Sequence, residues 1–160
     1  MLKNKALHFM EEQTIIRWGF IFLFGMMALS GFGQMPIFKR YYIADIPGLG
    51  WLADFYFTHT LHYIGASLLI FLFLYVTAAY FLLGKKTVKF TTAGYVRAIL
   101  LVSILITGVF RVLKNLPGIT FSPGFTMFID ISHLTFMMMY VAAAIGFFFT
   151  KQGWLKKIED

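Results

Sequence analysis

Two histidines, each near the start of a long apolar run, are the residues in this sequence best suited to cofactor chemistry. His62 precedes Tyr63-Ile64-Gly65, and His133 follows Ser132 at the start of a later apolar stretch. An imidazole inside a membrane span is costly unless it has a partner. Neutral imidazole nitrogens can ligate haem iron, one on each face of the ring. We therefore expect His62 and His133 to be metal ligands, the two axial ligands of one haem b.

The composition places the chain among integral membrane proteins. Its 160 residues are 59% hydrophobic and 13% charged, with a mean hydropathy of +0.77, whereas soluble domains carry about 25% charged residues. This length suits a single membrane domain over residues 1–160, without a separate soluble catalytic domain. The net charge of +7 comes from short basic flanks between apolar runs, so we expect membrane lipids as partners and no nucleic acid.

The absence of cysteine narrows the cofactor chemistry. Without cysteine, the chain cannot form a disulfide, ligate an iron–sulfur cluster by thiolates or attach a c-type haem covalently. Any haem must therefore be held non-covalently, by histidine or methionine.

Hydropathy predicts an all-α integral membrane four-helix bundle. The expected spans are about 15–35, 60–83, 95–113 and 128–150, each near the 20 residues that a bilayer requires. We expect residues 1–14 to form a short interfacial helix or tail. The long loop 36–58 is expected to form a surface helix or a docking face for a partner subunit. The sequence shows no internal repeat.

The distribution of basic residues predicts the orientation. The N-terminal flank, the 84–97 connection and the C-terminal tail together contain ten Lys and Arg, and the two opposite connections contain four. The positive-inside rule then puts both termini in the cytoplasm. The expected location is the inner (cytoplasmic) membrane, as a multi-pass protein.

With this topology, four candidate site residues fall at a similar depth, near the outer boundary: His62, His133, Gly31 and Arg111. Gly31 would open a slot for a flat ring, Gly65 would let its edge approach the helix, and Arg111 or Lys114 could neutralise propionates. Each residue also has a simpler interpretation. The glycines could serve helix packing, Arg111 could snorkel to headgroups as Arg97 could, and the histidines could be interfacial hydrogen-bonding residues.

Two further residues leave alternatives open. His59 lies one turn before His62 and could be the ligand in its place. Asp130 could accept a proton or hold the second nitrogen of a ligating imidazole, although an N-terminal helix cap is the simpler interpretation.

Short stretches of the chain resemble a known family of membrane subunits. They are Arg17-Trp18 and Ala28-Leu29-Ser30-Gly31-Phe32, then Leu61-His62-Tyr63-Ile64-Gly65, Thr107-Gly108-Val109 with Arg111, and Ser132-His133. In their order and spacing they resemble the cytochrome b (gamma) subunit of membrane-bound formate dehydrogenases and the related nickel–iron hydrogenase subunits. The resemblance implies a periplasm-facing iron–sulfur subunit and a catalytic subunit as partners, with menaquinone or ubiquinone as the electron carrier.

The resemblance also implies a departure from the family. Its members hold an outer haem through histidines at the positions of His62 and His133, and an inner haem through two more histidines. Here the inner positions correspond to Arg17 and about Phe147, which cannot ligate iron. We therefore predict one haem b, on the outer side. Quinone could bind beside it, a partner subunit could carry the electrons onward, or the chain could be mainly an anchor whose haem is structural.

Three functions follow as expectations. The first is a membrane-anchoring, non-catalytic electron-transfer subunit of a respiratory oxidoreductase, connecting an iron–sulfur subunit with the quinone pool. The second is a haem-free membrane anchor or assembly subunit. The third is a small transporter. Transporters usually have charges near the middle of their spans and often an internal repeat, and this sequence shows neither feature.

Overall fold

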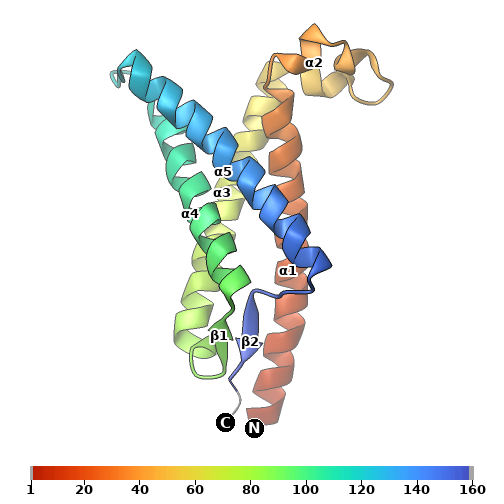
Figure 1. The fold of residues 1–160 in the computed structure, drawn as a ribbon, viewed down its shortest axis with the longest axis vertical. Helices are drawn as coiled ribbons and strands as arrows, with labels where there is room; N and C mark the ends of the chain where they lie inside the picture. The colour runs from red at the N-terminus through yellow and green to blue at the C-terminus, as the bar shows by residue number, and fades with distance from the viewer. Residues whose placement is uncertain (1, 159–160) are drawn as a thin grey trace. The chain divides into compact units, whose positions relative to one another are not determined.

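A computed structural model describes the backbone of residues 2–158 and, except at positions 2–13, 39, 83 and 157, their side chains. The chain is mainly helical (Figure 1). In chain order the elements are α1 (Leu2–Gly33), α2 (Ile37–Arg40), η1 (Ile43–Asp45), η2 (Gly50–Ala53), α3 (Phe55–Ala79), η3 (Tyr80–Gly84), β1 (Val88–Phe90), α4 (Thr92–Leu113), α5 (Pro123–Phe149) and β2 (Leu155–Lys157).

Four of these helices are long and apolar enough to cross a membrane. The candidate spans are Thr14–Gly33, Phe55–Leu82, Thr92–Leu113 and Pro123–Phe149. Each exposes large apolar side chains, for example Phe22 at 70%, Phe71 at 70%, Ile99 at 64% and Phe148 at 73%. Water disfavours so much exposed apolar surface, whereas lipid accommodates it. The four helices confirm the predicted helical membrane class and indicate a multi-pass membrane protein.

The chain divides into two compact units, residues 1–78 and residues 79–160. In the first unit, α1 and α3 run in opposite directions and the short helices α2, η1 and η2 connect them at one end (Figure 1). Leu52 of η2 is buried against Gly33, where a Cβ would lie 3.0 Å from the Leu52 carbonyl oxygen. Because Gly33 has no side chain, the connection can fold back onto the end of α1.

Two expectations about this unit are revised. Residues 2–14 do not form a separate segment, because α1 is continuous from Leu2 to Gly33. No proline or glycine interrupts the sequence between position 2 and Gly19, so the helix is free to continue. The 36–58 loop contains three short helices in place of one, and its alternative role as a docking face stays a prediction.

In the second unit, α4 and α5 pack side by side in opposite directions (Figure 1). Thr91 caps α4 through the Gly94 amide, and Ser122 caps α5 through the Phe125 amide. Pro123 stands at the first turn of α5, a position that proline favours. The cap and the proline explain why α5 begins five residues before the expected span.

The second unit also contains a two-stranded antiparallel sheet, which the all-α prediction missed. β1 and β2 pair with Val88 opposite Lys157, Lys89 opposite Lys156 and Phe90 opposite Leu155. The Thr91 hydroxyl donates to the Gly153 carbonyl at 2.6 Å, and the Thr91 amide donates to the Trp154 carbonyl at 3.1 Å. The C-terminal segment is thus fixed to the start of α4.

Candidate functional site

His62 projects from α3 toward α1. Its Nδ1 lies 3.0 Å from the Ser30 hydroxyl oxygen, and Ser30 is fully buried. The next residue, Gly31, leaves room for the ring, since a Cβ there would lie 3.2 Å from His62 Cε1. The structure therefore brings His62 together with one predicted residue, Gly31, and one unpredicted residue, Ser30.

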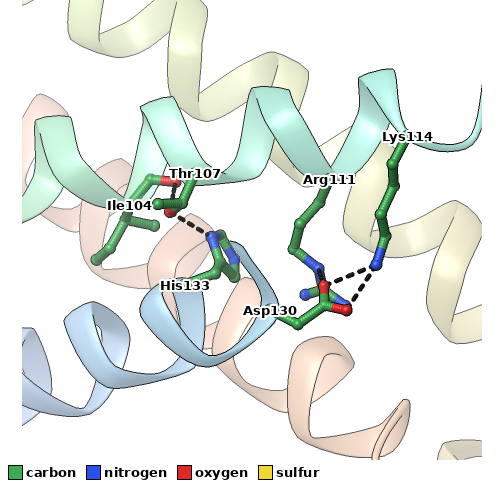
Figure 2. Close-up of polar contacts among 6 residues, drawn as sticks. All are labelled: Ile104, Thr107, Arg111, Lys114, Asp130 and His133. Atoms are coloured by element: carbon green, nitrogen blue, oxygen red, sulfur yellow. Dashed lines mark hydrogen bonds and ion pairs between the residues drawn. The ribbon is translucent and has the colours of Figure 1, made fainter. Parts of the chain in front are cut away.

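His133 has the same kind of environment in the second unit. Its Nδ1 lies 3.0 Å from the Thr107 hydroxyl oxygen of α4, and Figure 2 shows this edge of the ring facing α4. A Cβ at Gly108 would lie 3.3 Å from His133 Cε1. Each imidazole is thus hydrogen-bonded to a serine or threonine hydroxyl. Each ring also lies against the glycine that follows that serine or threonine in the sequence.

The two histidine helices share a burial pattern as well. Four residues before each histidine is a fully buried side chain, Thr58 or Ile129. Seven residues after it is another, Leu69 or Tyr140, each 3% exposed. These positions share one helix face with the histidine. The arrangement is therefore repeated in both units, although the hydroxyl precedes its histidine by 32 residues in one and 26 in the other.

Ser30, Thr107 and Gly108 are site residues that the sequence analysis did not assign. The available sequence signal was a Ser-Gly or Thr-Gly dipeptide late in the span preceding each histidine span. This pattern is hard to recognise as a repeat, because the distance in sequence from the dipeptide to the histidine differs between the two units.

His59 has different neighbours from His62. Its ring stacks on Phe55 at a centroid distance of 5.3 Å and contacts Tyr63 at 4.3 Å, both on its own helix. His62 therefore contacts a hydroxyl group of α1, whereas the ring contacts of His59 are with its own helix α3.

Gly65 contacts methionines of α1. A Cβ at Gly65 would lie 2.6 Å from Met27 Sδ and 2.7 Å from Met26 Cε. In this structure Gly65 therefore allows α1 and α3 to pack closely, which is the simpler of its two interpretations.

Arg111 forms part of a charged cluster near the end of α4. Its Nε lies 3.0 Å from Asp130 Oδ1, and Lys114 Nζ lies 2.7 Å from Asp130 Oδ2 (Figure 2). The Arg111 and Asp130 side chains remain 39% and 38% exposed. Two cations share one carboxylate, so the cluster carries one net positive charge. Asp130 is not the N-terminal cap of its helix, because α5 begins at Pro123 and Ser122 supplies that cap.

Arg97 does not snorkel to the membrane surface as proposed from the sequence. It is only 7% exposed, and its guanidinium lies 4.9 Å from the Phe147 ring centroid and 5.6 Å from that of Trp154. The returning C-terminal segment brings Trp154 to this site, which explains why the sequence pattern alone could not predict it. Phe147 is thus a partner of Arg97.

A shallow apolar hollow of about 210 Å³ lies between α4 and α5. It is lined mainly by Phe110, Phe125, Phe128 and Phe136, together with Thr107. Such a lining suits an acyl or isoprenoid chain and offers no acid–base pair.

The two imidazoles, of His62 and His133, are compatible with a haem. They are too few to hold a metal ion whose ligands all come from the protein. Among the described residues, no cluster of three or more His, Cys, Asp or Glu could hold a metal ion. A porphyrin supplies four ligands to its iron and needs one nitrogen from each of two histidines. Comparisons of the chain with protein-family models, with characterised proteins and with solved structures give no significant match.

Proposed function

We propose that the chain is a membrane-anchoring cytochrome b subunit of a respiratory oxidoreductase. It passes electrons between a periplasm-facing iron–sulfur subunit and the quinone pool through one haem b. The observation that carries this proposal is the matching environment of His62 and His133. Each is an imidazole in a candidate membrane span, hydrogen-bonded at Nδ1 by a hydroxyl 3.0 Å away and seated against a glycine.

The chemistry of these donors fits a bis-histidine haem. A ligating imidazole is commonly oriented by a hydrogen bond to its other nitrogen, and both histidines have such a bond at Nδ1. In this proposal His62 and His133 would be the two protein ligands of one haem b. When bound there, the haem would supply one-electron transfer.

Other residues of the chain have supporting roles in this proposal. Gly31 and Gly108 admit the two rings, and Gly65 brings α1 and α3 close together. The net positive charge of the Arg111, Lys114 and Asp130 cluster would attract propionates. Arg111 and Lys114 would share this role, because both are paired with Asp130.

The proposed partners and location rest on the family resemblance. They are an iron–sulfur subunit, a separate catalytic subunit, and menaquinone or ubiquinone in the inner membrane. One haem on the outer side is proposed because Arg17 and Phe147 replace the inner ligands. Both termini would be cytoplasmic in this topology.

The absence of native cysteine makes the proposed orientation directly measurable. We expect Lys86→Cys and Lys156→Cys to be protected from an impermeant maleimide in intact cells, and Thr120→Cys to be labelled. All three positions are exposed. The opposite labelling pattern would reverse the topology.

The haem proposal is tested by reduced-minus-oxidised visible spectra of the chain purified with its partners. We expect a b-type spectrum that is lost in His62→Ala and in His133→Ala and is kept in His59→Ala. Retention of the full spectrum in either of the first two variants would exclude that residue as a ligand. If the b-type spectrum were lost in His59→Ala and kept in His62→Ala, His59 would be the ligand in place of His62.

A haem-free membrane anchor is the second candidate function, and one observation favours it. Both imidazoles already link two helices through hydrogen bonds to Ser30 and Thr107, which would stabilise the helix pairs without any cofactor. In that case the purified complex would contain no haem, and His62→Ala would reduce assembly alone.

A further inference from the structure

We propose that Ser30 and Thr107 are positioning residues that hold both histidines in the tautomer with the proton on Nδ1. The lone pair is then on Nε2, the nitrogen that would ligate the haem iron. This inference deepens the proposed function and rests on it.

The Ser30 hydroxyl has one proton, and a backbone carbonyl accepts it. Ser30 Oγ lies 3.2 Å from the Met27 carbonyl oxygen of its own helix, in donor geometry. With its proton directed there, the oxygen can only accept from the ring nitrogen 3.0 Å away. His62 Nδ1 must then be the protonated nitrogen, because a neutral imidazole has one donor and one acceptor.

The same proton assignment holds more strongly for Thr107. Its Oγ1 donates to the Ser103 carbonyl at 2.8 Å, with the Ile104 carbonyl as a second acceptor at 3.1 Å. The hydroxyl oxygen therefore accepts from His133 Nδ1 (Figure 2).

The glycines and hydroxyls together define the ring orientation. A flip of either ring by 180° would replace Nδ1 by a carbon, which cannot form the hydrogen bond. Gly31 and Gly108 contact Cε1, the atom between the two nitrogens. The Nδ1–Cε1 edge of each ring is therefore held against the neighbouring helix.

Asp130 lies three residues before His133, but its two oxygens engage Arg111 and Lys114. A neutral hydroxyl transfers less electron density to an imidazole than a carboxylate does. In the contacts described, Thr107 and not Asp130 hydrogen-bonds His133.

The test uses isosteric or truncating variants with matched controls. Thr107→Val and Ser30→Ala remove the accepting hydroxyl groups. Thr107→Ser keeps a hydroxyl group at position 107. Thr58→Val and Ser103→Ala are the controls, since their hydroxyls bond only backbone carbonyls of their own helices in the contacts described. We expect haemin affinity to fall about 10- to 100-fold in Thr107→Val and Ser30→Ala. It should remain within about twofold of wild type in Thr107→Ser and in both controls.

A second readout uses the haem-free protein. Nitrogen NMR of the four histidines, assigned by single substitutions, should show His62 and His133 protonated at Nδ1. Thr107→Val should convert His133 to a mixture of tautomers and leave His62 unchanged. Protonation of either ring at Nε2 in the wild type would overturn the inference, as would equal loss of haemin affinity in the controls. If the protein binds no haem, the proposed function fails, while the NMR result still decides the tautomer.

Discussion

The Ser30 hydroxyl oxygen lies 3.0 Å from His62 Nδ1, although 32 residues separate the two positions. The contact joins the end of α1 to the start of α3 and fixes which faces of the two helices meet. Thr107 and His133 form the same contact in the second unit, at the same distance. Two helix pairs with different sequences thus converge on one way of orienting an imidazole.

The glycines beside the two rings provide a steric prediction. Gly31→Ala and Gly108→Ala would put a Cβ 3.2 and 3.3 Å from a ring carbon, so each ring must shift by a few tenths of an ångström. We expect the affinity for haemin to fall several-fold, with a changed spectrum, in titrations of the haem-free protein.

Gly25→Ala and Gly146→Ala are matched controls, because no neighbouring atom lies within 4 Å of their added Cβ. They should bind haemin normally and gain up to about 1 kcal/mol of helix stability. Equal binding in all four variants would show that Gly31 and Gly108 do not support the rings.

The charged cluster predicts opposite shifts of the haem midpoint potential. Asp130→Asn removes the negative charge that Arg111 and Lys114 share, and the added net positive charge should raise the potential. Arg111→Gln should lower it for the converse reason. A redox titration of each variant at low and high salt measures both effects. Screening by salt should reduce them, because Arg111 and Asp130 are more than one-third exposed. Shifts of the same sign in both variants would contradict this assignment.

The buried Arg97 predicts a loss of stability on a conservative change. Arg97→Lys keeps the charge but loses the planar group that stacks on Phe147 and Trp154. We expect a loss of about 0.5–2 kcal/mol in unfolding free energy, the range for exposed to desolvated cation–π contacts. Unfolding in detergent monitored by circular dichroism would measure it. Arg40→Lys, at an exposed position, is the control and should be neutral.

The attachment of the C-terminal segment predicts a protease phenotype. An added Cβ at Gly94 would collide with the Trp154 carbonyl, so Gly94→Ala should displace β2 from β1. Trypsin should then cleave after the exposed Lys151 and Lys156 faster than in wild type, as read by mass spectrometry. Gly146→Ala should leave the cleavage rate unchanged, and the same rate in Gly94→Ala would argue against this packing.

The sequence predicted those features that depend on local composition. Continuous apolar runs identified the four long helices, and the histidines were found because imidazoles are rare in such runs. It missed β1 and β2, because three-residue strands such as Val88–Phe90 carry too short an alternation to recognise. It also missed the burial of Arg97, since this depends on the return of Trp154 from the end of the chain.

The partners of the histidines could not be predicted for a similar reason. Serine and threonine within an apolar helix usually bond their own backbone, as Ser67 and Ser103 do. Only the packing of α1 on α3 distinguishes Ser30 from these residues, and only the packing of α4 on α5 distinguishes Thr107. Asp130 likewise looked like a helix cap until the start of α5 and its two cationic partners were located.

The most direct test of the central claim is the haem content per chain, determined from a pyridine extract of the purified complex. Electron paramagnetic resonance of the oxidised form would be recorded on the same sample. We predict one haem b per chain with a low-spin bis-imidazole signal, which becomes high-spin or disappears in both His62→Ala and His133→Ala. Two haems per chain, each lost with a different histidine, would contradict shared ligation. No haem would contradict the electron-transfer function and leave the membrane-anchor function in its place.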